Sequence, residues 1–175
     1  MPSTLRQGRT DAAGRLIKAS PAAIYQAFVD PSALMQWLPP GGMSGRVLEF
    51  DPRTGGRYRI ELAYEVPAPP AVAKTTERTD ISEGRFLALE PSRRIVQSVE
   101  FVSTDPAFAG VMVMTWSLET EGDGTRVTIT AENVPHGISK EDHDAGLQSS
   151  LKNLAHFVER PRGTAAPRSH GRDRR

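Results

Sequence analysis

The sequence predicts an α+β fold in which a curved antiparallel sheet wraps around a long C-terminal helix, with two short helices after the first strand. Three features predict it: two helix starts near the N-terminus, a run of strands entered at Gly55-Gly56, and an amphipathic segment at residues 139–159. A helix that is apolar on one side must bury that side, here against a sheet. One domain is expected, since 175 residues suit a single core with a cavity beside it.

Two short helices are expected after an opening strand at residues 15–19. Ser-Pro at 20–21 and Asp-Pro at 30–31 each combine a side chain that caps free backbone amides with a proline that loses no needed donor. The chain therefore breaks and restarts as a second helix, which ends at the Pro-Pro-Gly-Gly run at 39–42. The apolar side chains expected to anchor these helices are Ile24, Phe28, Leu34 and Trp37.

Alternation of apolar and polar residues marks the strands that follow. Residues 66–72 contain three prolines and are expected to form a loop, because proline cannot donate to a sheet ladder. The expected strands are residues 57–64, 84–89, 95–102, 111–119 and 125–131. Their expected inner face carries Tyr58, Ile60, Leu62, Tyr64, Met112, Met114, Trp116, Leu118, Val127, Ile129 and Ala131.

Glu100 lies in the strand at 95–102, where the pattern leaves its direction open. Pointing inward it would be a buried carboxylate, and an isolated buried charge is expensive. The register that turns Glu100 toward solvent is therefore favoured.

The final helix is expected at residues 139–159. Ser139, with Asp142 three residues later, approximates a capping box. Roughly 21 residues at 1.5 Å each reach ~30 Å, long enough to cross the whole sheet. The apolar stripe of this helix is Leu147, Leu151, Leu154 and Val158.

His143 precedes that stripe by four residues and shares its face. A histidine at the open end of a cavity could orient a ligand or transfer a proton near neutral pH, which makes it a weak candidate for a catalytic residue. The alternative is a half-exposed histidine beside the acidic side chains that surround it in the sequence.

Charge is distributed unevenly along the chain. The net charge is +1, but the six arginines from Arg160 onward, against Asp173, give the tail +5 and leave the rest near −4. The tail at 161–175 has no large apolar residue, so we expect it to be disordered, as are residues 1–13, around a folded domain at 14–160. Nucleic-acid binding needs a basic patch on folded structure and is not expected of this domain.

Several kinds of site are disfavoured. The chain has no cysteine, hence no thiol nucleophile or thiolate metal site. The four histidines are too scattered to bind a metal, and no cofactor is expected. Gly55-Gly56 lacks the ending of a phosphate loop and precedes a strand, so we interpret it as a glycine bulge. No secretory signal or membrane span is recognisable, which favours a cytoplasmic location.

These positions together resemble the START-like (SRPBCC) superfamily, in the branch named for activators of the heat-shock chaperone ATPase. The resemblance covers roughly residues 15–159. Its motifs are Lys18-Ala19-Ser20-Pro21, Trp37, Gly55-Gly56-Arg57-Tyr58, Glu90-Pro91-Ser92-Arg93, Gly124-Thr125-Arg126, and Gly146-Leu147 followed by Leu151 and Leu154. The resemblance implies a helix-grip fold with an internal cavity.

Two departures from the family pattern qualify that implication. Leu147 stands where the family usually has a tryptophan after the helix glycine, which implies a roomier or differently shaped cavity floor. The asparagine-tryptophan-histidine motif associated with stimulation of the chaperone ATPase is absent from the N-terminal region. A chaperone partner is compatible with the family but unsupported by a motif.

Three functions remain open. The leading one is a binding protein whose cavity, within the ~300–1,000 Å³ range of ligand pockets, holds an apolar, aromatic or lipid-like small molecule. The second is a cyclase- or dehydratase-like enzyme with a cavity acid or base, and the third is a chaperone-associated or regulatory interaction module. A homodimer is compatible with all three. The expected ligand-binding residues are Tyr58, Ile60, Tyr64, Met112, Met114, Trp116, His143, Leu147 and Leu151.

Overall fold

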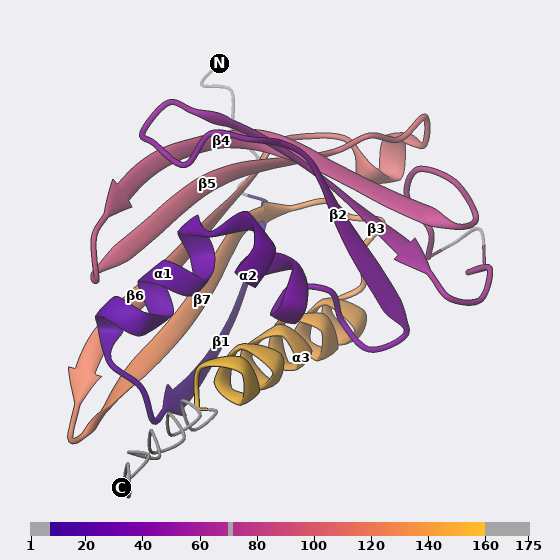
Figure 1. The fold of residues 1–175 in the computed structure, drawn as a ribbon. Helices are drawn as coiled ribbons and strands as arrows, with labels where there is room; N and C mark the ends of the chain where they lie inside the picture. Colours follow the sequence, from indigo (N-terminus) through magenta and orange to yellow (C-terminus); the bar gives the residue numbers. More distant parts are fainter. Residues whose placement is uncertain (1–7, 70–71, 160–175) are drawn as a thin grey trace, which may run out of the picture.

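The computed structural model describes residues 8–69 and 72–159 of the chain. Within them, one seven-stranded antiparallel sheet has the strand order β1-β7-β6-β5-β4-β3-β2 (Figure 1). The elements are β1 (Arg9–Ile17), α1 (Pro21–Val29), α2 (Pro31–Trp37), β2 (Met43–Phe50), β3 (Arg57–Tyr64), β4 (Thr79–Glu90), β5 (Arg94–Phe101), the 3-10 turn η1 (Pro106–Phe108), β6 (Met112–Glu121), β7 (Gly124–Val134) and α3 (Lys140–Val158). The expected α+β class is confirmed.

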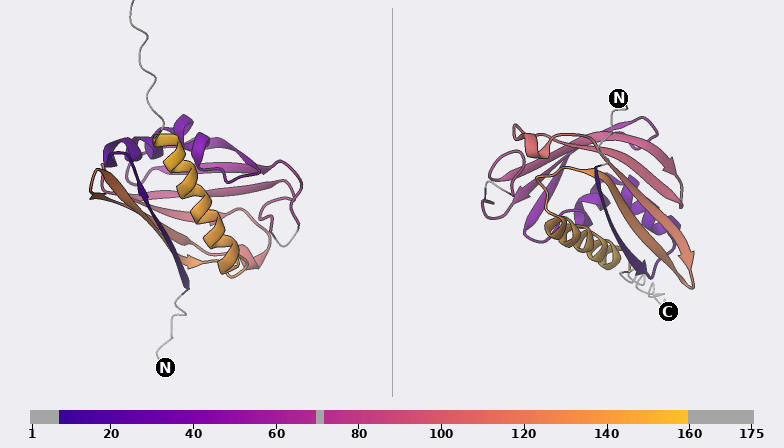
Figure 2. Two further views of the ribbon diagram at one scale, coloured as in Figure 1. Left: turned by 90° about the horizontal axis from the view of Figure 1, so that it is seen from below. Right: turned by 180° about the vertical axis from the view of Figure 1, so that it is seen from behind.

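All three α-helices lie on the concave side of the curved sheet (Figure 1). α3 crosses this side next to β1, as two further views show (Figure 2). α1 and α2 contact each other, and each also contacts α3. The core therefore lies between the helices and the concave face, as a helix-grip fold requires.

The helix starts occur where the capping residues predict them. The Ser20 hydroxyl accepts a hydrogen bond from the Ala23 amide at 3.1 Å and begins α1. Asp30 joins the two short helices, since its backbone amide donates to the Gln26 carbonyl at the end of α1 while its carboxylate caps α2. The Ser139 hydroxyl accepts from the Asp142 amide at 3.0 Å and begins α3.

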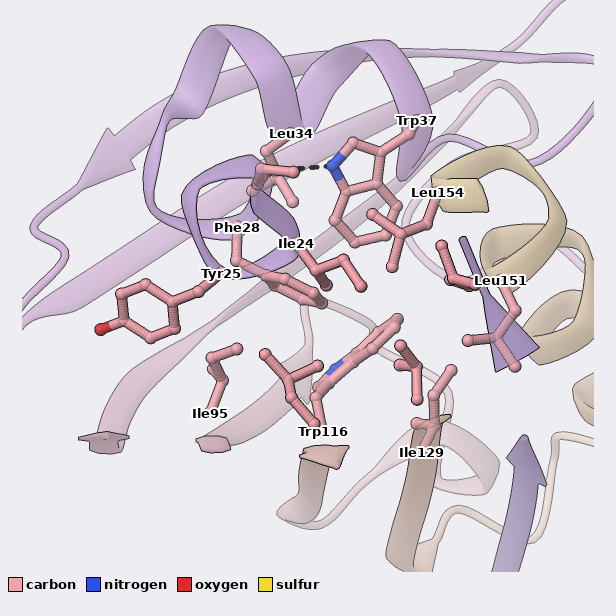
Figure 3. Close-up of a cluster of buried hydrophobic side chains, with 14 of the residues drawn as sticks. Ile24, Tyr25, Phe28, Leu34, Trp37, Ile95, Trp116, Ile129, Leu151 and Leu154 are labelled. Carbon is pink, nitrogen blue, oxygen red and sulfur yellow. Dashed lines mark hydrogen bonds between the residues drawn. The ribbon is translucent and has the colours of Figure 1, made fainter. Parts of the chain in front are cut away.

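Three aromatic rings form the centre of the core. The Phe28 ring lies 4.8 Å from Trp37 and 4.6 Å from Trp116, centroid to centroid, both in edge-to-face geometry (Figure 3). The Trp37 indole nitrogen donates to the Ala27 carbonyl at 3.0 Å, so its polar atom is satisfied although the side chain is fully buried. These contacts fix α1 and α2 on β6.

The inner faces of the strands follow the expected alternation. Tyr58 and Ile60 of β3, Trp116 and Leu118 of β6, and Val127 of β7 are all buried. Glu100 is exposed, so the register that turns it toward solvent is confirmed.

The structure corrects the expected bounds in several places. β1 begins at Arg9, so the segment 1–13 expected to be disordered overlaps an ordered strand. β2 was not expected, and β4 begins at Thr79 instead of residue 84. The tail at 161–175 lies outside the described residues.

Gly55 and Gly56 lie in the turn between β2 and β3, not in a bulge within a strand. Gly55 has a φ of +84°, a backbone conformation that favours glycine. A Cβ at Gly56 would lie 2.9 Å from the Arg53 carbonyl oxygen. The two glycines are therefore explained by a tight turn.

Candidate functional site

The space expected to form a cavity between the final helix and the sheet is filled by side chains. Five of the residues expected to border it belong to one buried core cluster with Phe28 and Trp37. These five are Tyr58, Ile60, Trp116, Leu147 and Leu151, none more than 5% exposed. A void of about 20 Å³ remains beside Trp116, room for about one water molecule. This space is core.

A larger pocket lies on the same concave side, where the first turns of α3 face β3 and β4. Its volume is about 260 Å³, more than the ~150 Å³ cavity that holds benzene in an engineered protein, so one or two aromatic rings would fit. Its lining is mainly apolar and includes Met43, Leu62, Val72, Phe101 and Ile138. Its polar side chains are Tyr64, Lys74, Asp80, Ser82, Asp142 and His143.

Asp80 organises the polar groups on the sheet side of the pocket. The Tyr64 hydroxyl donates to its Oδ2 at 2.8 Å, the Lys74 amide to its Oδ1 at 2.7 Å, and the Lys74 ammonium to its Oδ2 at 3.0 Å. Lys74 Nζ also lies 5.1 Å from the ring centroid of Phe101, within cation–π range. The buried Asp80 carboxylate is thus fully compensated.

Tyr64 remains a hydrogen-bond donor at neutral pH. Burial raises its pKa, and the hydrogen bond to Asp80 and the negative charge of that carboxylate raise it further. The sheet side of the pocket therefore presents a neutral hydroxyl and an ammonium group to a ligand.

His143 enters from the helix side and is held by Asp11 of β1. Its Nδ1 lies 2.8 Å from Asp11 Oδ2, and its side chain is 12% exposed while that of Asp11 is fully buried. Arg9 Nε donates to both Asp11 oxygens at 3.1 Å, and its Nη2 donates to the Ile138 carbonyl at 2.6 Å. These contacts tie the sheet edge to the start of α3.

The charge state of Asp11 decides the tautomer of His143. Burial alone would raise the pKa of Asp11, but hydrogen bonds from His143 and Arg9, together with the positive charge of Arg9, lower it overall. An ionised carboxylate can only accept hydrogen bonds, so Nδ1 of His143 carries the shared hydrogen. In the neutral ring, Nε2 then has a free lone pair.

The lowered pKa of Asp11 predicts an acid-sensitive contribution to stability. A carboxyl whose folded-state pKa is depressed stabilises the fold fully above its unfolded-state pKa of ~3.9 and loses that contribution as pH falls through the folded value. The difference in unfolding free energy between wild type and Asp11→Asn should therefore narrow below about pH 4. Urea unfolding of both proteins at a series of pH values measures this difference. Asp123→Asn, at an exposed turn residue, is the control variant. A difference in unfolding free energy between wild type and Asp11→Asn that stays constant as the pH falls would contradict the lowered pKa of Asp11.

The structure separates the sequence-predicted site residues into three groups. Tyr64 and His143 line the 260 Å³ pocket. Met112 belongs to a second buried cluster around Val99, and Met114 is partly buried against both clusters. The remaining five are in the main core.

Sequence reasoning missed Arg9, Asp11, Lys74 and Asp80. Asp11 lies two residues before the buried Ala13, and Asp80 lies in the unexpected first part of β4. Extending both strands by their alternation would have placed these carboxylates on the inner face.

Metal and membrane sites have no support in the described residues. No group of three or more histidine, cysteine, aspartate or glutamate side chains in residues 8–69 and 72–159 could hold a metal ion. In the same part of the chain, no helix is long and apolar enough to cross a membrane.

Comparisons with known proteins agree with the fold. The family model described as Activator of Hsp90 ATPase homolog 1-like protein matches residues 18–159. The crystal structure of protein CV1439 from Chromobacterium violaceum is 35% identical, with a TM-score of 0.77 over 87% of this chain and 98% of that one. An AHSA1-like protein from Aeromonas hydrophila is 19% identical, with a TM-score of 0.62 over 86% and 92% of the two chains, which shows the fold alone. No curated protein matches the sequence.

Proposed function

The chain belongs to the Activator of Hsp90 ATPase homolog 1-like family, and on this basis we propose that it binds a small molecule with an apolar body and a polar end in the pocket beside the start of α3. The family fold supports a ligand-binding or chaperone-associated module in general. The observation that carries the finer proposal is the pocket of about 260 Å³, with apolar walls and a few convergent polar groups.

The polar groups define which end of the ligand they would recognise. His143 Nε2 has a lone pair for a ligand hydroxyl, and the Lys74 ammonium has hydrogens beyond the one given to Asp80. The apolar body would lie against Leu62, Met43 and Phe101. A one- or two-ring molecule with a hydroxyl or carbonyl oxygen matches this arrangement.

Protein interaction has weaker support from the described surface. The exposed large apolar side chains include Leu16 of β1, Leu48 of β2 and Leu87 of β4, which come from strands that are not neighbours in the sheet. Single exposed apolar residues are normal on soluble domains and mark no docking patch.

Binding of 2-naphthol tests the proposal. We expect saturable binding with a Kd of about 0.1 mM, typical of a ligand of this size. Gly146→Phe should weaken binding at least about tenfold, because Gly146 lines the pocket and a Cβ added there meets no atom within 4 Å, so the ring can enter without moving the backbone. Titration calorimetry measures both constants.

Ala145→Phe is the matched control, since Ala145 is the preceding residue of α3 and is exposed outside the pocket. It should bind 2-naphthol like the wild type. Equal binding by Gly146→Phe would show that the pocket is not the site. Native mass spectrometry of the purified wild type and of Gly146→Phe is a second test, in which a co-purified natural ligand should be present in the wild type and lost in the variant.

A further inference from the structure

We propose that His143 is a general base toward the molecule held in the pocket beside α3, and that Asp11 is the residue that positions its imidazole. The inference rests on the proposed function, because it needs a ligand in that pocket. It adds a reaction class, removal of a proton from a carbon acid such as a small carbonyl compound. It also gives a role to Arg9 and Asp11, which binding alone does not require.

A partly buried network of Asp11 and Arg9 holds the imidazole on the side away from the pocket. Asp11 lies 2.8 Å from Nδ1 of His143, and the side chain of Asp11 is fully buried. Arg9 holds that carboxylate and also donates to the Ile138 carbonyl at 2.6 Å, just before α3 begins. The ring therefore has one tautomer and one orientation, as a catalytic base requires.

Nε2 is the nitrogen available to a ligand. His143 lines the pocket, and its Nδ1 is occupied by Asp11, which does not line the pocket, so Nε2 is the ring nitrogen left for a ligand there. In the described part of the chain, no residue forms a hydrogen bond with Nε2. A sheltered lone pair of this kind can take a proton.

The other titratable groups of the pocket are less suited to that role. Asp80 already accepts three hydrogen bonds, which occupy three of its roughly four lone-pair positions. Asp142 is exposed to water in the first turn of α3. Tyr64 donates its hydroxyl hydrogen to Asp80, and burial keeps it protonated. His143 is the remaining base.

The proton balance of the reaction closes without a co-reactant. Nε2 takes the proton from the carbon next to a carbonyl group, and the electron pair of that C–H bond forms the C=C bond of an enolate. The Lys74 ammonium supplies positive charge to the enolate oxygen. The C=O π pair moves onto the oxygen. Where the substrate has a C=C bond next to that carbon, the enolate is a dienolate, and return of the proton from Nε2 to its γ carbon completes an isomerisation to the conjugated carbonyl compound and restores the neutral imidazole.

The elimination of 5-nitrobenzisoxazole tests the base directly. Nε2 takes its ring C–H proton, the electron pair of that bond forms a nitrile, the N–O bond breaks, and a coloured nitrophenolate leaves. We expect saturable turnover by wild type and a fall in kcat of about 10²–10⁴-fold in His143→Gln. His136→Gln, at an exposed histidine outside the pocket, should react like wild type.

Two further variants separate a positioned base from a structural histidine. Asp11→Asn should lower kcat at least about tenfold with KM unchanged, because Asp11 does not line the pocket but would no longer fix the tautomer. His143→Ala should regain turnover when free imidazole is added, since the small base fills the vacated space. Circular dichroism and thermal melting confirm that each variant is folded.

The experiments distinguish failure of the proposed base from failure of the proposed binding function. Turnover lost in both Gly146→Phe and His143→Gln, with imidazole rescue of His143→Ala, supports the inference. If a folded His143→Gln variant turns over the probe as fast as the wild type, the proposed role of His143 as a base is overturned, and the proposed binding function remains intact. Probe turnover that neither saturates nor responds to Gly146→Phe, together with unchanged 2-naphthol binding in that variant, overturns both.

Discussion

Replacing Phe28 with alanine is expected to lower the free energy of unfolding by about 3–5 kcal/mol. The side chain is 5% exposed, and its ring contacts both Trp37 and Trp116 at centroid distances below 5 Å. Truncation removes the apolar contacts and leaves a cavity between two rigid indoles that cannot easily collapse into it. Urea unfolding followed by tryptophan fluorescence measures the loss, because both tryptophans report on this site.

Gln26→Ala is the matched control in the same helix. Gln26 is exposed, so its replacement should change the unfolding free energy by no more than about 0.5 kcal/mol. A loss for Phe28→Ala as small as that for Gln26→Ala would mean that the aromatic cluster does not hold α1 on the sheet.

Replacing Gly84 with alanine should cost about 3 kcal/mol, at the upper end for overpacking. A Cβ at this position would overlap the Ser98 carbonyl oxygen and lie 2.7 Å from the carbonyl carbon. Gly84 lies in β4 opposite Tyr58 of β3, between the ladder pairs that join β4 to β5. Relief of the overlap therefore requires movement of the backbone of β4 or β5 in the middle of the sheet. Thermal and urea unfolding measure the cost.

Gly14→Ala provides the comparison in another strand. A Cβ there would lie 3.5 Å from the Val127 carbonyl oxygen, an ordinary contact, so this change should be neutral or stabilising by up to about 1 kcal/mol. Similar stability for the two alanine variants would show that β4 and β5 have room to separate at Gly84.

Local signals in the sequence predicted the helices well. Each helix start depends on a cap within three residues of it, so Ser20, Asp30 and Ser139 could be identified without knowledge of the fold. β2 was missed because Gly45 interrupts its apolar pattern and its pairing with β3 shifts between Val47 and Glu49. A shifted register breaks the period of two by which strands are recognised.

The site was less predictable because its parts are distant in the sequence. His143 could be placed on the inner face of its helix, but its partner Asp11 is 132 residues away in a strand, and no local pattern pairs residues so distant in the sequence. The position of the pocket could not be obtained from the inner-face pattern either. Whether Phe28, Trp37 and Trp116 fill the space over the sheet depends on the packing of all three rings, and periodicity contains no information on volume.

The place of β1 in the sheet restricts the order in which the chain can fold during synthesis. Of the described strands, β1 is the first to leave the ribosome, yet β7 is its only ladder partner in the described sheet, with Arg9 opposite Val134 and Ile17 opposite Thr125. At ~5–20 residues per second, β1 waits about 5–20 s for that partner to be translated. During this interval Asp11 is hydrated and free of His143, which is translated later still. The pocket is therefore among the last features that a nascent chain can complete.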